Sequence, residues 1–342
     1  MGGQHYFSCM VLKRIILALI PALASAASVA CVEINDPVRE EMIFGIEETG
    51  HKSLPDMTTE TLRTAGFNVS ACFADRVGAV FSNIPAVYRG SGTYSLTTPQ
   101  YYPSRASGRK YCFVAVSGNS PSMFVPDTDD IDGDGRTDYV LPDISLPLTD
   151  IVVASAMEGY SGGVVPLEFR HILARIGGVT ARAASVSGHT CSAELKEVHL
   201  QVPSGGSYEL FSSGICSWEV SFADSLMEGQ PEDFVLYKAE SSGIVAGPSY
   251  VSLGYTGSYS IPSDNVGGTA VGLSLSVVYD IYIDSVLREE ARVETATVVL
   301  PGGMDTIFNL TLPMDSEMPL IAVPQCVRIM NWDESRVIGE II

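Results

Sequence analysis

Short segments in which apolar and polar residues alternate recur along the chain. In one of them Val198, Leu200 and Val202 are separated by His199 and Gln201. Because successive side chains of a strand point to opposite faces, such alternation predicts half-buried β-strands. Clusters of Gly, Pro, Ser and Asp separate these segments, and long helical patterns are hard to find. Further alternating segments lie at 67–73, 277–284 and 308–312.

Regularly spaced short strands without intervening helices are typical of antiparallel sandwiches. A chain of 342 residues is long enough for two domains, each with its own core. A flexible Gly- and Ser-containing stretch at 157–163 lies between two apolar segments. We therefore predict an all-β protein with two tandem antiparallel β-sandwich domains, at 31–157 and 158–342.

The N-terminus predicts export. Lys13 and Arg14 precede an apolar run at 15–23, and small residues follow it up to position 30. This pattern is typical of a signal peptide, here residues 1–30, and the run is too short to span a bilayer. Cys31 directly follows and is predicted to carry a lipid, which would anchor the protein to the outer membrane. The alternative is an ordinary signal-peptidase cut after Ala26.

Composition narrows the class of protein. Hydrophobic residues make up 46% of the chain, which indicates a globular and not a disordered protein. The formal net charge is −20, so we predict no nucleic-acid partner, because few cations are present to neutralise phosphates.

Cysteine spacing favours neither zinc nor thioredoxin-like chemistry. Beyond Cys31 the sequence holds five cysteines, and none forms a C-x-x-C pair. Export permits disulfides. Cys191 and Cys216 are the nearest pair in sequence, and buried unpaired cysteines are an equally good interpretation.

An Asp-rich segment predicts a calcium loop. Asp130, Asp132, Asp134 and Asp138 occupy loop positions 1, 3, 5 and 9, with a glycine at position 6 and the carbonyl of Arg136 available at position 7. Position 12 is a leucine, so the usual bidentate acid is missing and weak affinity is expected. The alternative is a solvated acidic loop; calcium is the one cofactor that the sequence suggests.

Catalytic chemistry finds little support in the sequence, and we predict that the protein is not an enzyme. Ser161 lies in a G-x-S-x-G pattern, but this motif needs a strand–turn–helix elbow, and strands are predicted on both sides. A turn between strands is therefore the better interpretation. His171, His189 and His199 are scattered and are interpreted as structural.

Several segments resemble the fimbrillin-like (Mfa-like) family of Bacteroidota. Residues 165–176 (VPLEFRHILARI) and 150–155 (DIVVAS) are similar to two consecutive strands of that family. Other similar pieces occur in the family's order, at 58–70, 207–218, 306–312 and 327–332. Arg170 replaces the lysine usual in the family, and the Asp-rich loop is not a family feature.

This resemblance implies two transthyretin-like sandwiches and a non-enzymatic subunit or accessory adhesin of a surface fimbrium. It further implies that an arginine-specific protease removes the first strand and that a neighbour's C-terminal strand replaces it. Residues 41–46 are the expected first strand. Arg63 is the preferred cut site, with Arg39 as the other candidate, and residues 336–342 are the expected donor. Other fimbrial subunits and a host or bacterial surface ligand are the implied partners.

Two alternatives remain open from the sequence. One is a surface lipoprotein that binds a glycan or protein and never polymerises, with Tyr101 and Tyr102 as its candidate binding residues. The other is a hydrolase that uses Ser161.

Overall fold

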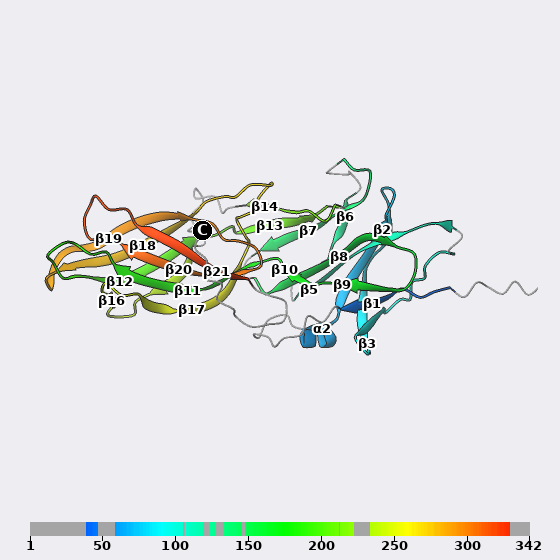
Figure 1. The fold of residues 1–342 in the computed structure, drawn as a ribbon, viewed down its shortest axis with the longest axis horizontal. Coiled ribbons are helices and arrows are strands. Elements are labelled where there is room, and N and C mark those ends of the chain that lie inside the picture. Colours follow the sequence, from blue (N-terminus) through cyan, green and yellow to red (C-terminus); the bar gives the residue numbers. More distant parts are fainter. Residues whose placement is uncertain are drawn as a thin grey trace, which may run out of the picture.

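The chain forms an elongated molecule with two lobes built almost entirely of strands (Figure 1). The computed structural model describes residues 39–46, 59–104, 107–118, 123–127, 133–145, 148–211, 213–221 and 233–328. In these ranges there is one α-helix, α2 (Thr59–Ala65), among twenty-one strands. The predicted all-β class is confirmed.

The first lobe contains an eight-stranded sheet and a four-stranded sheet. In spatial order the larger sheet consists of β10 (Arg170–His171), β8 (Ile151–Tyr160), β5 (Tyr111–Gly118), β2 (Phe67–Phe73), β3 (Ala79–Gly90), β4 (Thr93–Leu96), β1 (Ile43–Ile46) and β9 (Val164–Leu167). The smaller sheet consists of β14 (Cys216–Ser221), β13 (Gly205–Leu210), β7 (Asp138–Ser145) and β6 (Val125–Asp127).

Both faces of the eight-stranded sheet are covered at its centre. On one face, Val114 and Val116 of β5 share a core with Tyr139 and Tyr208 of the smaller sheet. On the other face, the sheet curls so that Phe44 of β1 packs against Phe113 of β5, with ring centroids 5.3 Å apart. The half-buried strand predicted at 67–73 is therefore buried on both sides, because the smaller sheet covers its second face.

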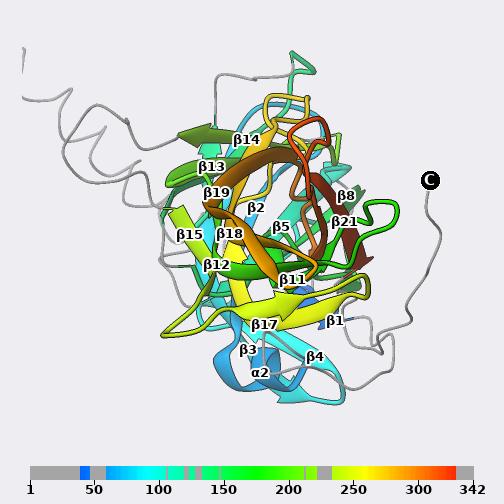
Figure 2. The same ribbon diagram turned by 90° about the vertical axis from the view of Figure 1, so that its left-hand side faces the viewer.

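The second lobe is a sandwich around a single core cluster. One of its sheets contains β17 (Val251–Ser260), β11 (Ala174–Ala183), β20 (Met304–Leu312) and β21 (Ile321–Arg328). The other contains β15 (Asp233–Lys238), β12 (Cys191–Gln201), β18 (Leu273–Ile283) and β19 (Val286–Val298), with β16 (Ile244–Ala246) also paired to β12. Figure 2 looks along the long axis with this lobe toward the viewer.

Alternation in the second lobe follows the sequence prediction. Val198, Leu200 and Val202 are buried, whereas His199 and Gln201 are partly exposed. Phe308 and Leu310 of β20 likewise face the core. Here one face of each sheet meets the other sheet and the other face meets solvent, which is the arrangement that period-two alternation predicts.

Pairing is mostly antiparallel, and two of the described pairs are parallel. These are β1 with β9 and β11 with β20. The sheets also join segments from both sides of residue 157. Strand β8 crosses that position, and the hairpin β13–β14 pairs with β7. The boundary between 31–157 and 158–342 stays a prediction of the sequence.

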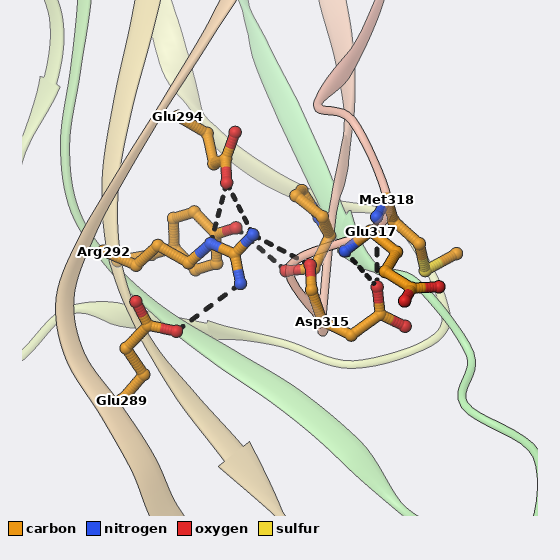
Figure 3. Close-up of polar contacts among 8 residues, drawn as sticks. Glu289, Arg292, Glu294, Asp315, Glu317 and Met318 are labelled. Carbon is orange, nitrogen blue, oxygen red and sulfur yellow. Dashed lines mark hydrogen bonds and ion pairs between the residues drawn. The ribbon is translucent and has the colours of Figure 1, made fainter.

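An ion-pair network supports the turn that leads into β21 (Figure 3). Arg292 of β19 has a side chain only 9% exposed. Its guanidinium donates to Glu294 at 2.6 and 2.8 Å and to the carbonyl of Asp315 at 2.8 Å. The Asp315 carboxylate accepts from the backbone N–H groups of Glu317 and Met318, each at 3.0 Å. The contacts tie the segment between β20 and β21 to the opposite sheet.

Candidate functional site

Strand β1 lies inside the eight-stranded sheet and not at its edge. It pairs antiparallel with β4 on one side, where Phe44 is opposite Tyr94. On its other side it pairs parallel with β9, where Phe44 is opposite Val165. Both rows of backbone polar groups of this short strand therefore meet neighbours, and its removal would leave unpaired groups on β4 and on β9.

Alternate side chains of this segment enter the core. Met42, Phe44 and Ile46 are 1%, 0% and 8% exposed, respectively. Burial of each such side chain is worth roughly 1.5–3 kcal/mol. The three side chains together make β1 a substantial part of the core of the first lobe. The resemblance to fimbrillin-like proteins implies a first strand at 41–46, and the structure has a strand over Ile43–Ile46 of this segment.

The segment just before β1 is also held in place. The Met42 N–H donates to the Gln100 carbonyl, and the Tyr102 N–H donates to the Glu40 carbonyl, both at 2.9 Å. The Glu40 carboxylate accepts from the backbone N–H of Gly163 at 2.7 Å. No local pattern in the sequence marks Glu40, because its partners lie far away along the chain.

Arg63 lies in the last turn of α2, between β1 and β2 in the sequence. Its guanidinium lies over the ring of Tyr88, 5.6 Å from the ring centre, and forms an ion pair with Glu60 at 3.3 Å. One-third of its side chain is exposed. One residue earlier, Leu62 is fully buried in the same core as Phe44. Cleavage after Arg63 would therefore detach both β1 and the Leu62 anchor from the rest of the chain.

The turn from α2 into β2 depends on Gly66. Its N–H donates to the Leu62 carbonyl at 2.9 Å, which ends the helix, and its φ is +73°. A Cβ at this position would lie 2.6 Å from the carbonyl oxygen of Ala86. A glycine is thus required both by the left-handed backbone and by the close approach of β3.

The second candidate cut site, Arg39, is at the first described residue and is exposed. It precedes β1, so a cut there would leave β1 attached to the chain. Cys31 and the expected donor at 336–342 lie outside the described residues, as does the signal peptide predicted at 1–30.

Of the Asp-rich loop, the structure describes only residues from 133 onward. Asp134 accepts from the backbone N–H of Arg136 at 2.8 Å, whereas Asp138 is fully buried at the start of β7, opposite Asp127. Asp130 and Asp132 lie outside the described residues. Within the described ranges, no group of three or more His, Cys, Asp or Glu side chains could hold a metal ion. The calcium loop stays a prediction.

Tyr101 and Tyr102 are the residues that the sequence suggests for a binding function. Tyr101 is 46% exposed, but Tyr102 is 3% exposed and its hydroxyl donates to the Gly163 carbonyl. Burial, together with the nearby Glu40, raises the pKa of Tyr102. The two tyrosines therefore do not form an exposed pair.

Ser161, the candidate nucleophile of a hydrolase, lies in the turn between β8 and β9, as the sequence predicts. His171 is buried and contacts Asp150 through Nδ1 at 2.8 Å, in agreement with a structural role.

Comparisons with known proteins find similarity in fold. The chain matches no family model, and no curated protein matches it. Its structure is similar to that of a fimbrial protein from Bacteroides vulgatus, with a TM-score of 0.53 and 16% identity, covering 84% of this chain and 99% of that one. A candidate cell adhesion protein from Parabacteroides distasonis gives a TM-score of 0.48 and 9% identity, covering 87% and 98% of the two chains. The first of these comparisons shows that the two chains share a fold.

Within the described part of the chain, no helix is long and apolar enough to cross a bilayer. Helix α2 has only seven residues.

Proposed function

We propose that this chain is a fimbrillin-like surface protein, a subunit or accessory adhesin of a fimbrium, that assembles by exchange of β-strands. The observation that carries the proposal is the position of β1, a four-residue strand with neighbours on both sides and with Phe44 wholly buried. The name and fold of the Bacteroides vulgatus protein support the fimbrial assignment. The order of the family-like segments in the sequence supports it independently.

In this proposal an arginine-specific protease cuts after Arg63 and releases β1. The empty position would expose backbone groups of β4 and β9 and the apolar side chains that now contact Phe44. Such an edge favours the addition of another strand. Residues 336–342 (RVIGEII) of a second copy would supply that strand. Because the donor and the groove are different surfaces, the contact repeats head to tail and does not close on itself.

Cleavage after Arg63 is expected to convert the monomeric protein into oligomers. Mature protein treated with an arginine-specific protease should form a detergent-resistant ladder on gels and elute early from a sizing column. Arg63→Lys should prevent this conversion, because it keeps the positive charge but removes the cut site. Arg39→Lys is the matched control and should polymerise normally after treatment.

A further variant tests the donor. Deletion of residues 336–342 should sharply reduce the ladder while leaving cleavage at Arg63 unchanged. If protein cleaved after Arg63 elutes as a stable monomer, polymerisation is wrong, and the non-polymerising lipoprotein that binds a glycan or protein becomes the better proposal.

We further propose that the mature protein begins at Cys31 and is held at the outer membrane through a lipid on that residue. The expected result is a lipid mass on the N-terminal peptide of protein extracted from membranes. Cys31→Ser should release the protein from the membrane fraction, because one acyl anchor group tethers without spanning. Detection of a free N-terminus at Ala27 would contradict the lipid anchor.

The Asp-rich loop is proposed to bind calcium weakly through Asp130, Asp132, Asp134 and Asp138. Chelation should then lower the melting temperature, and Asp132→Ala should abolish this response. At a calcium concentration a hundredfold above the dissociation constant, binding would stabilise the fold by about 2.7 kcal/mol. A melting curve that chelator leaves unchanged would identify the loop as a solvated acidic turn.

A further inference from the structure

Two buried cysteines face each other at the centre of the eight-stranded sheet. Cys72 of β2 is directly opposite Cys112 of β5 in the antiparallel register. They are 2% and 3% exposed and belong to the same core cluster, so their side chains lie on the same face of the sheet. The pairing continues past them, since the Ala74 N–H donates to the Lys110 carbonyl at 3.1 Å.

This register suits a covalent link. Directly opposed residues of an antiparallel pair have Cα atoms about 4.5–5.5 Å apart. Disulfides join residues whose Cα atoms are about 4.4–6.8 Å apart. A bond between these two cysteines therefore needs no movement of either strand.

We propose that Cys72 and Cys112 form a cross-strand disulfide in the exported protein. The proposal rests on the export proposed above but not on polymerisation. Both sulfur atoms are thiols in the present structure, so the bond would form by oxidation.

The other cysteines within the described ranges have no cysteine opposite them. Cys191 in β12 is opposite Ile283, and Cys216 in β14 is opposite Leu210. Cys326 in β21 is opposite Thr306. Cys191 and Cys216, the nearest pair in sequence, belong to different sheets.

In the folded protein the two thiols also contact each other. A hydrogen bond between them lowers the pKa of Cys112. The same hydrogen bond, together with burial, raises the pKa of Cys72. The Cys112 thiol also donates to the Met157 carbonyl at 3.3 Å. The thiolate is the attacking species in disulfide exchange, and either cysteine can supply it before the core closes.

The oxidant must be an external disulfide, such as an exported thiol–disulfide oxidase or oxidised glutathione. The thiolate of one cysteine attacks it, forms a mixed disulfide and expels one thiolate. The other cysteine then loses its proton and attacks the first cysteine's sulfur, which expels the second thiolate. In total the two cysteines lose two electrons and two protons, and the oxidant's disulfide becomes two thiols. Since both sulfurs are buried, we place these steps before the smaller sheet covers them during folding.

The position of the bond suggests what it would do. β2 and β5 are neighbours in the middle of the sheet, and β5 carries Phe113, which contacts Phe44 of β1. The link would keep these two strands together when β1 is absent. It would also close a chain loop of roughly 40 residues, for which the loss of unfolded-state entropy predicts appreciable stabilisation.

Peptide mapping tests the proposal directly. Mature protein is reduced, unfolded, and refolded in a buffer of oxidised and reduced glutathione, then alkylated and digested with trypsin without reduction. Cys72 and Cys112 lie in different tryptic peptides, 64–76 and 111–136, and the other three cysteines of the mature domains lie in further separate peptides. We expect a species in which 64–76 is joined to 111–136, and reductant should split it. Recovery of both peptides alkylated and unlinked, or linked to other cysteines, would overturn the proposal.

Stability gives a second measurement that does not depend on peptide recovery. Reductant should lower the melting temperature of the refolded protein by about 5 °C. Cys112→Ala should remove this sensitivity, whereas Cys191→Ala, a buried cysteine in the second lobe, should retain it. Equal melting temperatures with and without reductant would indicate that the pair remains two buried thiols. None of these results depends on Arg63 or on strand exchange, so failure here and failure of polymerisation are distinguishable.

Discussion

Phe44→Ala is expected to lower the free energy of unfolding by about 3–5 kcal/mol, the usual cost of emptying a buried aromatic position. Phe44 is fully buried, and its ring makes an edge-on contact with Phe113. Strand β1 is paired on both sides, so the surrounding structure can collapse only partly into the cavity. Chemical denaturation of the intact chain, followed by far-UV circular dichroism, would measure the loss.

Val164→Ala is the matched control for this substitution. Val164 is 51% exposed and lies on β9 beside β1, so its truncation should change stability by less than about 0.5 kcal/mol. Equal and small effects of the two substitutions would show that β1 contributes little to the core. Release of β1 would then leave no apolar groove between β4 and β9 for a replacement strand.

Phe44→Ala should also make release of β1 easier. A loss of 3–5 kcal/mol in the attached state raises the equilibrium population of the detached state by a factor of roughly 200 to 5,000. Arg63, which follows β1, should then be cut faster by an arginine-specific protease. The cleavage rates of the Phe44→Ala and Val164→Ala proteins, compared at one protease concentration, would measure this coupling.

Gly66→Ala is expected to lower the free energy of unfolding by about 2–4 kcal/mol. Part of this cost is the left-handed backbone, because φ is +73° and an alanine there is strained. The rest comes from the clash of the new Cβ with the Ala86 carbonyl oxygen, which belongs to β3 and cannot move alone. Thermal unfolding by calorimetry would detect a substitution of this size as a clear fall in melting temperature.

Gly92→Ala separates these two contributions. Gly92 has φ of +74°, nearly the value at Gly66, but its Cβ would meet no atom within 4 Å. Its substitution should lower the free energy of unfolding only by the strain of the left-handed backbone, about 1–2 kcal/mol. If both variants melt at the same temperature, the close approach of β3 to Gly66 does not contribute to stability.

How far the sequence predicts this fold can be judged from single strands. The alternation of Val198, Leu200 and Val202 predicted a strand with one buried face, and β12 is such a strand. At 67–73 the same argument predicted one polar face, yet Ser70 and Cys72 are buried. The smaller sheet that covers them contains residues from 125–145 and from 205–221. Local alternation carries no information about such distant partners.

The candidate site was predictable to a similar extent. Residues 41–46 and Arg63 could be named only from the resemblance to fimbrillin-like proteins. The parallel pairing of β1 with β9 and the contact of Glu40 with Gly163 could not, because they join positions more than 100 residues apart. The pairing of Cys72 with Cys112 joins positions only 40 residues apart, but it too depends on which strands become neighbours.

Under the proposed strand exchange, the mixed pairing of β1 bears on the direction in which a replacement strand enters. A strand that reproduces the pairing of β1 would run antiparallel to β4 and parallel to β9, and the two kinds of pairing use differently spaced hydrogen bonds. A strand inserted in the reverse direction would exchange the two patterns and lose the register of β1 with both neighbours. Every junction of a chain of such molecules would then have the same orientation, which would give the whole assembly two unlike ends, one with a vacant groove and one with a free tail.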